Sequence, residues 1–71
     1  MLTTYIKAAM HHAKYEMLYD KSFVGTINGF QGVISNQATL EACHNELEEV
    51  LEEWILLRVA KNLPLPEVDG V

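Results

Sequence analysis

The sequence predicts an α+β fold in which a three- to four-stranded antiparallel sheet packs against one long helix, with a short helix at the N-terminus. Three observations support this prediction. Apolar residues recur at every second position early in residues 13–36, a strong hairpin signal lies at Asn28-Gly29, and apolar residues recur at helical spacing within residues 39–62. The predicted order after the first helix is β-β-β-α-β, where residues 63–71 form either the last short strand or a tail.

Residues 1–12 have the pattern of a short amphipathic helix. Thr3 or Thr4 can cap it, and its apolar residues recur three or four positions apart. These residues are Leu2, Tyr5, Ile6, Ala9, Met10 and Ala13. The apolar stripe must pack against the rest of the chain.

The period changes to two at Ala13, which predicts a half-buried first strand. One set of side chains alternates with another along it: Ala13, Tyr15, Met17 and Tyr19 against Lys14, Glu16, Leu18 and Asp20. A turn is predicted at Asp20, Lys21 and Ser22.

Residues 22–27 form the second predicted strand, with Phe23, Gly25 and Ile27 on one face. The third strand lies within residues 30–36. It begins at Phe30 if the turn at Asn28-Gly29 has two residues, or at Gly32 if the loop is longer. We favour the longer loop, and Gly29 and Gly32 both permit positive φ.

A long helix is predicted over residues 39–62, with Thr39 as its N-cap. Glu41 in the first turn and Arg58 and Lys61 in the last turns suit the helix dipole. The prolines of the segment Leu63–Pro66 end the helix, because proline cannot continue it.

Residues 1–71 are expected to form a single domain with one small core. The predicted core residues are Tyr15, Met17, Phe23, Ile27, Val33, Leu40, Leu47, Val50, Leu51 and Trp54. A core in a chain of this length supplies only about 3–5 kcal/mol of stability. Self-association is therefore expected.

Composition excludes several classes of function. The formal charge of −5 and only five scattered Lys and Arg residues argue against nucleic acid as a direct ligand. Cys43 is the single cysteine, which excludes an intrachain disulfide and a paired-cysteine zinc site. No segment has the length of a signal-peptide core or a membrane span, so a soluble, cytoplasmic protein is expected.

The glutamates of the long helix are the main candidate site. Residues 39–62 carry a formal charge of −4 out of the total of −5. The candidate partner-binding residues are Glu41, Glu48, Glu49, Glu52 and Glu53. Two interpretations stay open, a solvated helix face and a docking surface that attracts a basic partner.

No catalytic residue, metal or cofactor is expected. His11 and His12 are adjacent, as are Cys43 and His44, and adjacent helical side chains point about 100° apart. Glu16 and Asp20 lie where some nuclease folds carry metal-binding carboxylates, but no second carboxylate cluster completes a two-metal site.

The order of these features resembles the HicB-like antitoxin family of bacterial toxin-antitoxin systems. That family has two strands, a Pro-Gly-Val motif opening a third, a Gly-x-Thr-Leu-Glu-Glu-Ala helix start, a Glu-rich helix with Trp or Tyr, and a Leu-Pro-x-Pro exit. The matching residues are Phe23, Ile27, Gly32, Val33, Thr39, Leu40, Glu41, Ala42, Leu47, Glu49, Leu51, Trp54, Pro64 and Pro66. Gln31 replaces the usual proline, and Gln37-Ala38 replaces a common Gly-acidic pair.

The resemblance implies a partial ribonuclease-H-like unit without catalytic carboxylates. It also implies binding to a small basic HicA-type toxin, an mRNA-cleaving ribonuclease whose active site the antitoxin covers, and assembly into dimers or tetramers. Longer family members add a DNA-binding domain. This chain ends at Val71 without one, so direct DNA binding is not expected.

Two hypotheses of different classes follow. The first is a non-enzymatic, antitoxin-like binding protein that contacts its toxin through the acidic helix and the sheet edge. The alternative is a solitary homo-oligomeric scaffold or regulatory domain without a toxin. A degenerate nuclease using Asp20 or Glu16 is a distant third.

Overall fold

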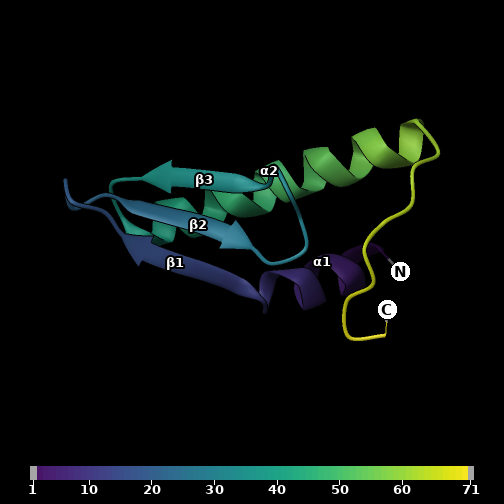
Figure 1. The fold of residues 1–71 in the computed structure, drawn as a ribbon, viewed down its shortest axis with the longest axis horizontal. Coiled ribbons are helices and arrows are strands. Elements are labelled where there is room, and N and C mark those ends of the chain that lie inside the picture. The colour runs from purple at the N-terminus through teal and green to yellow at the C-terminus, as the bar shows by residue number, and fades with distance from the viewer. Residues whose placement is uncertain (1, 71) are drawn as a thin grey trace.

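A computed structural model describes residues 2–70 and confirms the predicted α+β class (Figure 1). Two helices and three strands follow one another within these residues. Their bounds are α1 Leu2–Met10, β1 Ala13–Met17, β2 Phe23–Ile27, β3 Ile34–Gln37 and α2 Leu40–Ala60. The predicted boundaries of both helices lie within about two residues of these.

The three strands form one antiparallel sheet in the order β1-β2-β3. Helix α2 runs behind the sheet and packs mainly against β2 and β3, while α1 lies beyond the N-terminal end of β1 and contacts α2 (Figure 1). Gly25 and Ser35 lie opposite each other on the face that α2 covers, where both are buried. The other face of the sheet has no covering element within residues 2–70.

A tight turn joins β1 to β2 at the predicted place. Lys21 adopts a positive φ of 68°, and the Leu18 amide donates to the Ser22 carbonyl at 2.7 Å. The Asp20 carboxylate accepts hydrogen bonds from the Ser22 hydroxyl at 2.6 Å and the Ser22 amide at 3.0 Å. These two bonds hold the pKa of Asp20 below its ordinary value, because they favour the charged carboxylate.

The connection from β2 to β3 is the longer loop that the sequence favoured, but β3 begins at Ile34 and not at Phe30 or Gly32, because Val33 still closes the second turn. Two four-residue turns follow each other, closed by bonds from the Phe30 amide to the Ile27 carbonyl and from the Val33 amide to the Phe30 carbonyl, both 3.1 Å. Gly29 and Gly32 hold the same place in each turn with φ of 87° and 93°. Phe30 stands between the turns and is buried, so it anchors the loop on the core.

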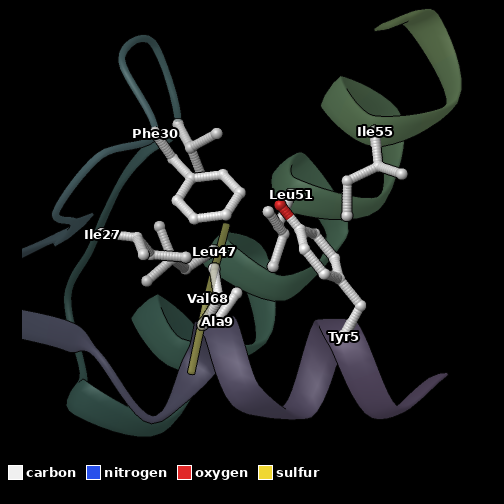
Figure 2. Close-up of a cluster of buried hydrophobic side chains, with 9 residues drawn as sticks. Tyr5, Ala9, Ile27, Phe30, Leu47, Leu51, Ile55 and Val68 are labelled. Carbon is white, nitrogen blue, oxygen red and sulfur yellow. The ribbon is translucent and has the colours of Figure 1, made fainter. Parts of the chain in front are cut away.

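The core lies where α1, α2, the β2–β3 loop and the tail meet (Figure 2). In Figure 2 the side chains of Tyr5 and Ala9 point from α1 toward Leu47 and Leu51 of α2. The buried cluster consists of Tyr5, Ala9, Ile27, Phe30, Val33, Leu47, Leu51, Ile55 and Val68. Ile27, Val33, Leu47 and Leu51 were predicted core residues, whereas the other five were not.

Two predicted core residues were wrong. Met17 is 63% exposed, because it ends an edge strand and α2 packs mainly over β2 and β3. Leu40 is 48% exposed, because it is the first residue of α2 and no preceding helical turn covers its side chain. Four other predicted core residues are only partly buried: Tyr15, Phe23, Val50 and Trp54.

The tail beyond α2 forms no strand between residues 61 and 70. Helix α2 ends in a Schellman motif, in which Asn62 has φ of 56° and the Leu63 amide donates to the Arg58 carbonyl at 2.8 Å. The tail then returns to α1, where the Tyr5 hydroxyl donates to the Pro66 carbonyl and Val68 is buried. The tail therefore completes the core instead of adding a fourth strand to the sheet.

Thr39 is the N-cap of α2, as predicted. Its backbone is extended, and its hydroxyl oxygen accepts a hydrogen bond from the Ala42 amide at 3.1 Å. Thr39→Ala is expected to lower the free energy of unfolding by about 1 kcal/mol, because a helix amide loses its partner. Urea unfolding followed by circular dichroism measures this loss. Thr39→Ser keeps the acceptor and should stay near the wild type; equal losses in both variants would contradict the capping role.

Candidate protein-binding surface

The candidate partner-binding glutamates lie on α2 away from its buried side. The buried side contains Cys43, Leu47, Leu51 and Ile55. Glu41, Glu49, Glu52 and Glu53 are exposed, and Glu48 is partly buried. At about 100° per residue, the five glutamates spread over the half of the helix opposite Leu47. They therefore belong to one broad acidic surface, although they do not form a single row.

No salt bridge joins these five glutamates to any residue within 2–70. Glu48 and Glu52, like Glu49 and Glu53, are four residues apart, so each pair repels by about 0.2–0.5 kcal/mol. Burial of Leu47, Leu51 and Ile55 holds the helix in place and outweighs this repulsion. The negative charge is therefore available to an external partner.

Apolar side chains extend this acidic surface toward the C-terminal end of α2. Leu56, Leu57 and Val59 are 61%, 59% and 56% exposed. Leu56 and Leu57 lie one turn after Glu52 and Glu53, so leucine and glutamate side chains are neighbours on the helix. We call the five glutamates together with these three residues the α2 outer surface.

The apolar part of this surface was not predicted from the sequence. A signal was present in the unbroken apolar run at residues 54–57. Four consecutive helical residues span about 300° around the axis, which is wider than one sheet can cover. Trp54 and Ile55 face the core, and Leu56 and Leu57 remain outside.

Glu46 has a structural role and is not part of the α2 outer surface. Its carboxylate accepts hydrogen bonds from the Asn36 amide at 2.9 Å and from the Gln37 side-chain amide at 2.7 Å. It therefore ties α2 to the outer edge of β3.

A tilted aromatic pair, Phe30 and Trp54, borders the α2 outer surface. The Trp54 ring lies 5.2 Å from Phe30, and the Arg58 guanidinium carbon lies 4.6 Å from the Trp54 ring centre. Arg58 also donates from Nε to the Pro64 carbonyl at 2.9 Å. This cation is therefore held over Trp54 and the tail, and it makes no salt bridge with the glutamates of residues 41–53.

Two of the three histidines, His12 and His44, and the single cysteine have side-chain partners within the fold. His12 bonds Asp69 at 2.9 Å, and His44 Nδ1 lies 2.8 Å from the Tyr15 hydroxyl oxygen. Cys43 is buried against Ser35, whose hydroxyl donates to the Cys43 carbonyl at 2.9 Å. In the part of the chain from residue 2 to 70, no three His, Cys, Asp or Glu side chains gather as possible metal ligands.

Burial raises the pKa of the Tyr15 hydroxyl above its ordinary value, and nearby Cys43 and Glu48 raise it further. The Tyr15 hydroxyl is therefore neutral at ordinary pH and can share one hydrogen bond with His44.

The two carboxylates considered for a nuclease lie in different settings. Glu16 is exposed on the strand β1, on the side opposite Tyr15, and Asp20 is bonded to Ser22 in the turn. Among residues 2–70, therefore, Glu16 and Asp20 belong to no group of three possible metal ligands.

These features define a small α+β protein whose prominent surface is an acidic and apolar helix. A sequence profile of the UPF0150-like family matches residues 4–66, and the chain belongs to this family. TTHA0281 from Thermus thermophilus is a structural relative with a TM-score of 0.93 and 31% sequence identity, over 99% of this chain and 88% of that one. No curated protein matches the chain.

Neither helix among residues 2–70 has the length and apolar character needed to cross a bilayer.

Proposed function

We propose that this chain is an antitoxin-like binding protein of the HicB type, which neutralises a small basic mRNA-cleaving toxin of the HicA type by covering its active site. The observation that carries the proposal is the α2 outer surface, where glutamates that form no salt bridge within residues 2–70 adjoin exposed Leu56, Leu57 and Val59. The family assignment and the order of motifs along the chain support it.

A surface of this composition suits a protein partner that is both basic and partly apolar. Negative charge attracts a basic protein over a distance and raises its rate of association. Apolar side chains then supply affinity when they lose contact with water. Leu56 lies opposite the buried side of α2, so a partner can reach it without disturbing the core.

The proposal assigns no catalytic step to this chain. Binding blocks the toxin by occupying its active site, which requires only a complementary surface. We propose that this takes place in the cytoplasm, where mRNA is cleaved, and the buried thiol of Cys43 suits a reducing compartment. No direct contact with DNA is proposed.

The experiment begins with the product of a small basic reading frame next to this gene. Co-expression should restore growth to cells that this product arrests, and the two purified proteins should form a complex. Failure to bind the neighbouring product, or the absence of such a neighbour, contradicts the antitoxin role.

Glu53→Lys is expected to slow association with the toxin roughly tenfold at low salt, because it places a like charge in front of a basic partner. The difference should shrink as salt screens the charges. Surface plasmon resonance at two salt concentrations measures both effects.

The matched control for Glu53→Lys is Glu67→Lys, which makes the same charge change in the exposed tail. Glu67→Lys should bind as the wild type does. Equal slowing by the two variants would assign the effect to net charge and remove the α2 outer surface from the proposal.

A second candidate function is a solitary homo-oligomeric scaffold or regulatory domain. The observation that favours it is the outer edge of β1, which has no pairing partner within residues 2–70. This function predicts stable assemblies of the chain with no toxin gene beside it. A chain that stays monomeric and well folded would contradict it.

A further inference from the structure

The two outer edges of the sheet differ. Along β3, the Asn36 amide points outward and donates to the Glu46 carboxylate at 2.9 Å, so a side chain of α2 engages that edge. Along β1, the backbone amides and carbonyls that point away from β2 form no hydrogen bond with any group of residues 2–70. An uncovered edge strand is a template for a further strand.

The register identifies which groups of β1 face outward. Leu18 donates to the Ser22 carbonyl, and this pair continues the alignment of Glu16 with Val24 and Lys14 with Thr26. In an antiparallel pair, residues bonded to the neighbour alternate with residues whose amide and carbonyl point away. The outward groups therefore belong to Ala13, Tyr15 and Met17.

The side chains on the uncovered face of β1 carry opposite charges two residues apart. Lys14 and Glu16 are both exposed, and they alternate with Tyr15, which lies on the α2 side. Reversing the direction of the strand exchanges the places of the two charges. The strand is therefore complementary in charge to an antiparallel copy of itself.

We propose that two copies of this chain associate through β1, antiparallel, about a twofold axis at Tyr15. The outward groups of Tyr15 then pair with those of Tyr15 of the second copy. Those of Ala13 pair with Met17 of the second copy, and those of Met17 pair with its Ala13. The two sheets become one sheet of six strands. Because the axis stands perpendicular to the sheet, both α2 helices lie on the same face and both α2 outer surfaces stay free.

Charge selects this register over its neighbours. With Tyr15 opposite Tyr15, Lys14 lies opposite Glu16 of the second copy in the closely spaced, non-hydrogen-bonded position, and this pair occurs twice. The two nearest registers that still pair outward groups are shifted by two residues in either direction. In one of them Lys14 lies opposite Lys14 of the second copy, and in the other Glu16 lies opposite Glu16 of the second copy. Like charges directly opposite each other destabilise a pairing of strands.

The same register explains the exposure of Met17. Met17 is 63% exposed in the single chain, although it belongs to the α2 side of β1. In the dimer it stands opposite Ala13 of the second copy, a small residue that leaves room for the longer side chain. The association thus covers an apolar residue that the isolated fold leaves in water.

The test is a charge exchange followed by sedimentation velocity over a range of protein concentrations. Lys14→Glu and Glu16→Lys each place like charges opposite each other and should raise the dimer dissociation constant about tenfold or more. The double variant Lys14→Glu/Glu16→Lys restores opposite charges in exchanged positions and should return the dissociation constant close to that of the wild type. Circular dichroism checks that each variant is folded.

Lys61→Glu is the matched control for Lys14→Glu, because it makes the same charge change at an exposed position beyond α2. It should leave dimerisation unchanged. A wild-type chain that stays monomeric at every concentration overturns the proposal, as does a dimer that persists in both single variants. If a single variant fails to fold, Met17→Lys tests the same edge, and an unaltered dimer there also overturns it. This inference does not use the α2 outer surface, so loss of toxin binding would leave it intact.

Discussion

Leu51→Ala is expected to lower the free energy of unfolding by about 2–5 kcal/mol. Leu51 is fully buried in the cluster where α1, α2 and the β2–β3 loop meet (Figure 2). The change removes the apolar contacts of the side chain and leaves a cavity that rigid neighbours fill only in part. A core of this size supplies only about 3–5 kcal/mol, so much of the chain should be unfolded at 25 °C. Urea titration and thermal unfolding by circular dichroism measure the effect.

The matched control is Leu56→Ala, which removes the same atoms from the same helix at a side chain that is 61% exposed. Leu56→Ala should change the free energy of unfolding by no more than about 0.5 kcal/mol. Similar losses in both variants would mean that Leu56 is buried, by a partner copy or by a different packing of α2. Leu56→Ala also tests the α2 outer surface, because toxin binding should weaken while the fold is kept.

Gly25→Ala is expected to destabilise the protein by about 1–3 kcal/mol, the cost of an extra methyl group in a filled space. A Cβ at residue 25 would stand 2.9 Å from Ser35 Oγ, 3.1 Å from Tyr15 Cε1 and 3.2 Å from Cys43 Sγ. The Ser35 hydroxyl is itself held by Cys43, so it cannot move freely. The close approach of α2 to the sheet therefore requires glycine at this position. Chemical denaturation measures the loss.

A double variant shows whether crowding is the cause. Ser35→Ala removes the nearest atom, so Gly25→Ala should cost less in a Ser35→Ala background than in the wild type. Thr26→Ala, at the adjacent exposed strand position, is the control and should change stability little. Additive losses from Gly25→Ala and Ser35→Ala would rule out their contact as the source of the destabilisation.

The acidic surface and the β1 edge lie on different parts of the molecule. The α2 outer surface faces away from the sheet, whereas the β1 edge lies on the side of the sheet opposite β3 (Figure 1). A dimer through β1 would therefore present two α2 outer surfaces, and each would be able to take one partner.

Local patterns in the sequence determined the helices and strands and some of their ends. The hydroxyl of Thr39 predicted the start of α2, and the Asp20–Ser22 segment predicted the first turn, because both use bonds between residues close in the chain. The two-residue period predicted Gly25 and Ile27 on one face of β2. The position of the candidate glutamates on the exposed part of α2 also followed from spacing alone.

Tertiary structure decided what periodicity could not. Met17 and Leu57 have the same apolar character and regular spacing as buried residues, yet they are exposed, because burial depends on which element lies above each position. Val68 shows the opposite case, in which an irregular tail fills the core after Asn62 turns the chain back toward α1.

The sequence by itself thus determined the elements, their order and the acidic face of the long helix, since each depends on short-range spacing, capping and charge. Only the tertiary structure decided that Glu46 binds the outward Asn36 amide of β3, while the outer edge of β1 has no partner within residues 2–70. The tertiary structure also decided that Leu56 and Leu57 lie beside the glutamates on the exposed side of α2. These outcomes depend on contacts between segments far apart in the chain, and one sheet face can cover only one side of a helix.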